Sequence, residues 1–419
     1  MYMLRPVEDH KQNEEYDQLA EHINDFGLTI LNKMIEMNKG KNIVISPTTI
    51  SSLLAMTLLG SVGVTFEEIV KVIGFSSDVL SYRKRHTQFG QLLESLTLDN
   101  ETKTLFANAI FADQNTQLRQ IYKEFTEKVY RGNISNIDFK NTSVSLDIIN
   151  KWVSEHTNEK IPLFLEDPLP LDTKVVLLSA LYFSGQWEKP FAPDQTANMT
   201  FTKEDGEKIE AELMLNFGHF NFLFSEELDS YLIALPYRGR DTIMYGLKPR
   251  KPQQLTLPDL LKKINAKKLD KLIESSRPSP CVVRFPKMHL TYRTDLSHVL
   301  KLLGIKTMFG SEANFGLMVD ADGKVDDEEE KLVLRTGVEG ENYIDALSRL
   351  PNPGVHVDSI IHEVQMTINE FGTEATAVGS GILSRTAKLF LTDSPFYMFI
   401  RNEKTKLITF SAAIFDPTK

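Results

Sequence analysis

The pattern of apolar positions divides the chain into an early part rich in helices and a later part rich in strands. Apolar residues recur at helical spacing over residues 16–37. Residues 50–59 are apolar on nearly every side, so we expect a helix that lies inside the molecule. Residues 175–183 are typical of a buried central strand, and residues 201–244 alternate with a period of mostly two. Separate runs of helices and strands predict an α+β fold.

Local signals mark the ends of several elements. Pro47 and the hydroxyl residues around it suit a helix start, where side-chain oxygens accept hydrogen bonds from free N–H groups. Gly60 and Gly63 predict the end of that helix. The same reading predicts helices at 144–156, 257–273 and 296–303, and strands at 103–111 and 282–292.

The N-terminus and one interior segment depart from this regular pattern. Residues 1–16 are polar and charged and predict a loose arm. No linker or repeat divides the rest, so residues 17–419 are expected to form one domain. Seven acidic residues lie among the eleven at 320–330, and we interpret 319–354 as an exposed acidic insertion. Its glycine stands fourth rather than sixth from the first aspartate, so it does not match a calcium-binding loop.

Composition excludes several classes of protein. The net charge of −10 argues against a nucleic-acid partner. No apolar run is long enough to predict a membrane-spanning helix, and the N-terminus has no apolar signal-peptide region. The single cysteine, Cys281, excludes an intrachain disulfide, and its strand-like surroundings favour a buried inert thiol over a reactive one. The nine histidines show no metal-ligand spacing, so no metal or other cofactor is expected.

Catalytic motifs are also missing. Gly379-Ser380-Gly381 lacks the spacing of a nucleophile elbow. His362 and Glu363 begin like a zinc-protease helix, but Met366 stands where the second histidine is needed. The chain is therefore not expected to be an enzyme.

Two surface features leave alternatives open. Arg83, Lys84 and Arg85 could bind a sulfated polyanion, or could form the solvated start of a helix. Four glycosylation sequons occur, at Asn100, Asn133, Asn141 and Asn198, which is close to the number expected by chance and leaves the compartment undecided.

The segment Asn369-Glu370-Phe371-Gly372-Thr373-Glu374-Ala375-Thr376-Ala377 resembles the hinge of a serpin reactive loop. Other motifs similar to the family's follow in the expected order over residues 20–418: Ser46-Pro47-Thr48-Thr49-Ile50, Asn150-Lys151-Trp152, Ser179 to Phe191, Phe285-Pro286-Lys287-Met288, Ile361-His362, Asp393-Ser394-Pro395-Phe396 and Phe415-Asp416-Pro417. The chain is thus identified as an arthropod-like member of the serpins, a family of serine protease inhibitors, with a short reactive loop.

This resemblance implies three β-sheets surrounded by eight or nine helices, with an exposed reactive loop. A protease cleaves the loop, the loop inserts as a new strand in the main sheet, and the acyl-enzyme is trapped as the metastable fold relaxes. The resemblance also implies a monomer and favours secretion and glycosylation, with a cytoplasmic location as the alternative.

The resemblance assigns further residues to three places. The hinge comprises Glu370, Gly372, Thr373, Glu374, Ala375, Thr376 and Ala377. The shutter beneath the inserting strand comprises Ser46, Thr49, Ser179 and His362, although the family usually has Ser and Asn where Thr49 and Ser179 stand. The breach at the top of the sheet comprises Trp187, Lys287 and Glu370.

The loop sequence permits insertion, because the face that alternates from Thr373 carries no charge and is small up to Gly381. Two glycines on that face each cost a strand roughly 0.5–1 kcal/mol relative to alanine. The expected scissile bond is Arg385–Thr386, which suits a trypsin-like protease, whereas the family's usual spacing would place it at Thr386–Ala387.

The segment after Arg385 is short. Only four residues precede Phe390, where we expect the next strand to begin, and inhibitory relatives usually have several more. Four missing extended residues remove about 13 Å of reach. The primary prediction is therefore a suicide-substrate inhibitor of a trypsin-like protease, and the alternative is a non-inhibitory serpin that acts as a decoy substrate or binding protein.

Overall fold

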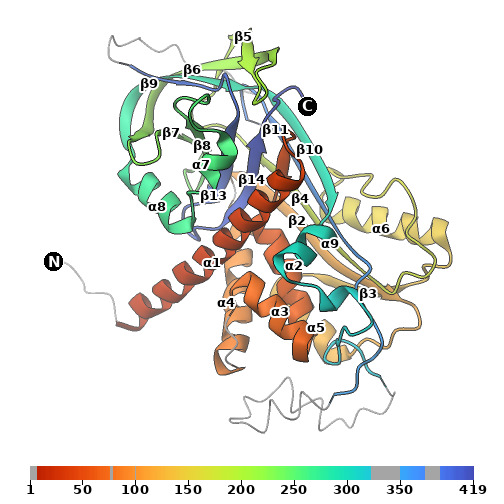
Figure 1. The fold of residues 1–419 in the computed structure, drawn as a ribbon. Coiled ribbons are helices and arrows are strands. Elements are labelled where there is room, and N and C mark those ends of the chain that lie inside the picture. The colour runs from red at the N-terminus through yellow and green to blue at the C-terminus, as the bar shows by residue number, and fades with distance from the viewer. Residues whose placement is uncertain (1–6, 76–78, 100, 322–349, 373–386) are drawn as a thin grey trace.

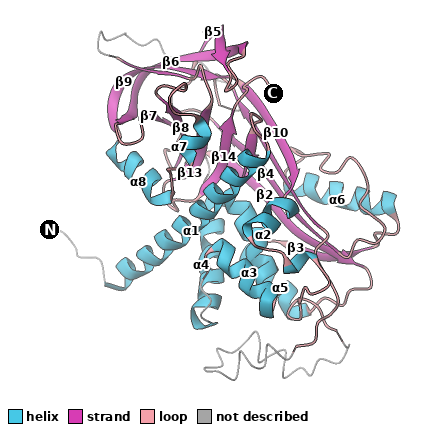
Figure 2. Cartoon of the chain, viewed as in Figure 1, coloured by secondary structure: helices cyan, strands magenta, loops and turns pink. Residues whose placement is uncertain are grey.

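The computed structural model describes residues 7–75, 79–99, 101–321, 350–372 and 387–419. Helices in these ranges come mostly before strands, as the apolar pattern predicts, and the α+β fold is confirmed. The nine α-helices of the described residues are α1 (Val7–Met37), α2 (Pro47–Leu59), α3 (Gly63–Ile73), α4 (Val79–Thr97), α5 (Gln120–Tyr130), α6 (Thr142–His156), α7 (Leu257–Leu261), α8 (Ala266–Ser275) and α9 (Ser297–Leu303). In Figure 2, α2 to α5 cluster at the lower end, whereas α7 and α8 lie beside strands at the upper left.

Hydrogen bonding joins the described strands into two sheets. The five-stranded sheet has the order β10-β11-β4-β2-β3 and consists of β2 (Thr102–Asp113), β3 (Asn133–Ile137), β4 (Val175–Gly185), β10 (Met288–Asp295) and β11 (Ser359–Ile368). The nine-stranded sheet has the order β1-β14-β13-β8-β7-β6-β9-β12, with β5 also paired to β6. Its strands are β1 (Ile43–Ile45), β5 (Ala192–Thr202), β6 (Lys208–Ser225), β7 (Ser230–Pro236), β8 (Thr242–Pro249), β9 (Arg277–Pro286), β12 (Lys388–Leu391), β13 (Phe396–Asn402) and β14 (Ile408–Ile414).

The resemblance implies three sheets, whereas the hydrogen bonds of the described strands form two. The long strand β6 pairs with β5 over its first residues, with β9 over most of its length, and with β7 from Phe222 to Ser225. One continuous strand thus connects what would otherwise be two sheets.

Helix α2 is buried along its whole length, as its apolar sequence predicts. Ser46 caps it, because its Oγ accepts a hydrogen bond from the Thr49 N–H at 3.2 Å, and Pro47 occupies the first turn. The helix packs against one face of the five-stranded sheet, and α6 covers the other face over β2 and β4. Figure 1 shows the sheet between these two helices.

Three boundaries differ from expectation. Helix α1 begins at Val7, so the part of the predicted loose arm that the structure describes is helical. The helix expected at 257–273 is two helices, because Asn265 caps a new one by accepting from the Lys268 N–H. The strand expected at 282–292 is also divided, with β9 and β10 in different sheets on either side of Lys287.

Candidate functional site

Two parallel neighbours, β4 and β11, form the centre of the five-stranded sheet. Their register runs from Ser359 opposite Val176 to Met366 opposite Phe183. We call this line of pairing the β4–β11 seam. The two strands bond directly to each other along it, with no strand between them.

The chain turns at the upper end of the seam. Beyond β11, Gly372 adopts a positive φ of 102° and forms an isolated bridge with Gln186, just after the end of β4. A Cβ on Gly372 would stand 2.0 Å from the carbonyl oxygen of Gly185, so this position requires glycine for conformation and for space. The turn directs the chain from the end of β11 across to the end of β4.

The predicted breach residues lie together at this turn. Lys287 Nζ is 3.3 Å from Glu370 Oε2, and Thr196 Oγ1 donates to Glu370 Oε1 at 2.7 Å. Burial acts to raise the pKa of Glu370, but the Thr196 hydrogen bond and the Lys287 ammonium outweigh it, so the pKa lies below its ordinary value. The Glu370 side chain is 8% exposed and that of Lys287 is 42% exposed, so only the carboxylate side of this pair is buried.

Trp187 holds the main chain of the same turn. Its Nε1–H donates to the Asn369 carbonyl at 2.9 Å, and its backbone N–H donates to the Phe371 carbonyl at 3.1 Å. Its ring stacks on Tyr237 with centroids 4.4 Å apart. The breach thus fixes the end of β11 by side-chain and backbone bonds.

The shutter residues meet halfway down the seam. The Ser46 N–H donates to His362 Nε2 at 3.1 Å, and His362 Nδ1 lies 3.2 Å from Ser179 Oγ. Burial lowers the pKa of His362 to about 3, although a backbone bond from Ser179 opposes the shift. Because Nε2 accepts, the neutral ring carries its proton on Nδ1 and donates it to the Ser179 hydroxyl.

A buried asparagine completes the shutter. Asn108 in β2 lies opposite Ser179, and its Nδ2 donates to the Thr49 carbonyl at 3.3 Å. Sequence reasoning missed both Asn108 and Thr196. A polar residue in the otherwise apolar run Phe-Ala-Asn-Ala-Ile-Phe was the signal that could have indicated Asn108.

The remaining hinge residues, Thr373 to Ala377, and the expected scissile pair Arg385 and Thr386 lie outside the described residues. The strand after the loop, β12, begins at Lys388, two residues earlier than expected. It pairs in parallel with β9, and Phe390 is fully buried, which fixes its register. The segment between Arg385 and the sheet is therefore even shorter than the sequence indicated.

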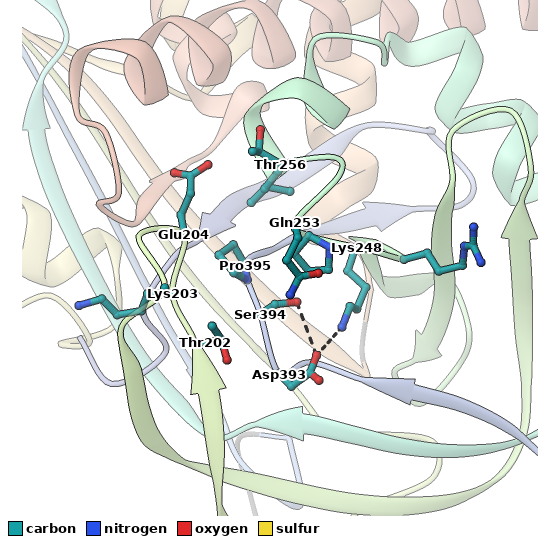
Figure 3. Close-up of a pocket in the computed structure, with 13 residues that line it drawn as sticks. Thr202, Lys203, Glu204, Lys248, Gln253, Thr256, Asp393, Ser394 and Pro395 are labelled. Atoms are coloured by element: carbon teal, nitrogen blue, oxygen red, sulfur yellow. Dashed lines mark hydrogen bonds and ion pairs between the residues drawn. The ribbon is translucent and has the colours of Figure 1, made fainter.

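A cavity of about 380 Å³ lies at the far end of β12, between the β5–β6 hairpin and the β8–α7 connection. Lys248 is buried in its wall and donates to Asp393 at 2.6 Å and to the Leu391 carbonyl at 2.5 Å. Figure 3 shows Lys248, Asp393 and Ser394 joined on one side of this cavity, with Glu204 above them. These contacts fasten the chain just after β12.

The other candidate residues, in the basic cluster and at Cys281, are less suited to binding or reaction. In the basic cluster, Lys84 pairs with Glu15 at 2.5 Å, and Arg85 donates to the Glu15 carbonyl at 3.2 Å. The neighbouring His86 is buried against Tyr130 rather than exposed. Burial raises the pKa of Cys281 to about 11, which supports its interpretation as an inert thiol.

The described part of the chain gives no sign of a membrane span or a metal site. None of its helices is both long enough and apolar enough to span a membrane. None of its His, Cys, Asp and Glu side chains form a group of three or more that could hold a metal ion.

Together the fold and site describe an α+β protein in which two parallel central strands meet at a seam, with a tight glycine turn at its upper end. A family model described as "Serpin (serine protease inhibitor)" matches residues 21–417, and the chain belongs to this family. The family generally comprises protease inhibitors rather than enzymes.

The chain is similar to curated proteins of animals. It is 29% identical to intracellular coagulation inhibitor 1 of Tachypleus tridentatus, covering 93% of this chain and 87% of that protein. It is 28% identical to α1-antitrypsin of Sus scrofa, covering 99% and 91%. Human thyroxine-binding globulin has the same fold, with a TM-score of 0.82 at 22% identity, covering 96% of this chain and 99% of that one.

Proposed function

We propose that this protein inhibits a trypsin-like serine protease as a suicide substrate. The protease serine attacks the Arg385 carbonyl, the Arg385–Thr386 bond breaks, and the new amino group of Thr386 leaves. The result is an ester between protease and Arg385. Insertion of the freed loop strand between β4 and β11 then carries the protease away before water hydrolyses the ester.

One observation carries this proposal. Gly372 brings the chain to the upper end of the β4–β11 seam, where β4 and β11 are direct neighbours with no strand between them. A strand that continues from this turn runs antiparallel to both neighbours, and its backbone groups can pair on both sides. The small, uncharged alternate residues from Thr373 onward suit the buried face of such a strand.

The alternative is a non-inhibitory serpin that acts as a decoy substrate or binding protein. The start of β12 at Lys388 favours it, because only Thr386 and Ala387 separate Arg385 from a strand that is fixed to the sheet. Two extended residues span only about 7 Å, which restricts how a protease can surround the bond. The thyroxine-binding relative was solved in complex with thyroxine, a binding role that does not need cleavage.

Trypsin distinguishes the two functions. The inhibitor gives a complex of protein and trypsin that survives SDS, whereas the decoy is cleaved without one. Thermal melting after loop cleavage gives an independent test of insertion. A large rise in melting temperature supports insertion, and an unchanged temperature contradicts it.

Location and further partners are part of the same proposal. A secreted, glycosylated monomer fits an extracellular protease target, although one relative's name places it inside cells. A polyanion at Arg83, Lys84 and Arg85 would have to compete with Glu15 for two of these cations.

A further inference from the structure

An arginine on the edge strand β10 connects both sides of the β4–β11 seam. Arg293 stands directly opposite Glu363 in the β10–β11 register, and its Nε lies 3.5 Å from Glu363 Oε2. Its Nη1 donates to the Phe164 carbonyl at 2.7 Å, and its Nη2 donates to Glu166 Oε1 at 2.6 Å. One guanidinium thus binds β11 and the segment that follows α6.

That segment packs mainly on the other side of the seam. Phe164 and Leu165 share a buried cluster with α6 and with Leu178 and Ala180 of β4, and the partly buried Ile361 of β11 packs against this cluster. Asn150 of α6 fixes them further, because its Oδ1 accepts from both backbone N–H groups, at 2.9 and 2.7 Å. In Figure 1, α6 lies on the opposite side of the sheet from α2.

The buried carboxylate makes this connection costly to lose. Glu363 is 1% exposed, and burial raises its pKa, while a hydrogen bond from Gln365 and the Arg293 charge oppose the rise. Without the guanidinium the carboxylate would keep only the Gln365 bond at 2.7 Å. All three guanidinium nitrogens of Arg293 take part, because each contacts a different partner.

We propose that Arg293 is a positioning residue that holds the β4–β11 seam closed by fastening the segment after α6 to β10 and β11. A strand placed in the seam would move β11 about 4.8 Å further from β4. Contacts of 2.6 and 2.7 Å cannot survive that separation unless residues 164–166 move with β11. The contacts of Arg293 with Glu363, Phe164 and Glu166, which we call the clamp, therefore set how readily the seam opens. The role of the clamp in inhibition rests on the proposed function.

Hydrogen exchange of the intact protein tests the clamp without any protease. In Arg293→Gln the seam amides, such as those of Leu181 and Val364, should exchange roughly tenfold faster, since charged hydrogen bonds across the seam are lost. Amides between β13 and β14 should keep their rates. Arg131→Gln is the matched control, because it removes an arginine–glutamate contact of the same 2.6 Å from α4 and α5.

Two further variants separate the clamp from general damage to the fold. Glu166→Gln removes the negative charge from a single contact at a side chain that is 66% exposed, so the fold should persist while the same seam amides exchange several-fold faster. Arg293→Lys keeps the charge but cannot reach three partners, and should give a rate between those of wild type and Arg293→Gln. Unchanged seam exchange in both Arg293→Gln and Glu166→Gln overturns the clamp.

Reaction with trypsin then tests whether the clamp affects the proposed inhibition. If Arg293→Gln opens faster and also diverts more protein into the SDS-stable complex, both proposals hold. If exchange accelerates but neither the variant nor wild type forms a complex, the clamp stands and the inhibitory function fails.

Discussion

Gly372 and Gly185 approach so closely that a Cβ on the first would stand 2.0 Å from the carbonyl oxygen of the second. This contact brings the end of β11 against the end of β4. It places Gly372, a residue of the predicted hinge, at the upper end of the seam into which we propose that the loop inserts. The relationship depends on glycine at position 372, and it can be tested directly.

Gly372→Ala should destabilise the intact protein by about 2 kcal/mol or more, because it combines a positive φ with a clash against backbone. Urea unfolding measures the loss. Gly40→Ala is the control, since Gly40 has a φ of 70° with nothing within 4 Å of the added methyl group. Equal losses in the two variants would show that the Gly185 contact is unimportant.

The neutral shutter histidine should make stability depend on pH. The pKa of His362 is about 3 when folded, against an ordinary 6.5, so the unfolded chain binds a proton first as the pH falls. The stability from keeping the ring neutral is complete above pH 6.5 and is lost as the pH falls towards 3. At pH 5 this loss amounts to about 2 kcal/mol.

His86 is also buried, and burial lowers its pKa to about 3, so it adds a similar dependence of stability on pH. The informative measurement is therefore the difference between wild type and His362→Gln, in unfolding experiments from pH 7 to pH 4. The gap between the two proteins should narrow by about 3 kcal/mol over that range. A gap that does not change with pH would contradict the assigned protonation state.

The breach pair should stabilise the end of β11. Lys287→Met removes the ammonium while Glu370 keeps its bond from Thr196, so we expect a loss of about 1 kcal/mol at pH 7. The pKa of Glu370 lies below its ordinary value of 4.5, so its stabilising effect is present above that pH and disappears as the pH falls further.

A double-mutant cycle with Glu370→Gln measures the coupling between the two side chains. The coupling should be favourable at pH 7 and should decline below pH 4.5. Additive effects at neutral pH would mean that the pair contributes nothing.

The scissile bond can be assigned by mass spectrometry. Trypsin should cut the native protein after Arg385, and Arg385→Ala should abolish this cut. Lys388→Ala is the control, because Lys388 lies within β12 and paired strands resist proteolysis. A cut after Lys388 in the wild-type protein would show that β12 opens readily and that the loop is longer than proposed.

Much of the fold could be read from local patterns. The apolar run at 50–59 predicted the buried helix α2, and the continuous apolar run at 175–183 predicted β4, because burial on all sides needs apolar residues throughout. The hinge segment predicted the family, which the family model confirms. The β9–β10 boundary was missed, because one continuous strand pattern runs through Lys287 while the chain changes sheet there.

The sequence by itself determined which segments are buried and which family the chain belongs to. Only the tertiary structure decided which polar groups meet, because His362 contacts a residue 316 positions away and Arg293 contacts one 127 positions away. Local patterns carry no information about such pairs. A buried histidine, glutamate or asparagine is stable only with its partner, and the packing of separate strands supplies that partner.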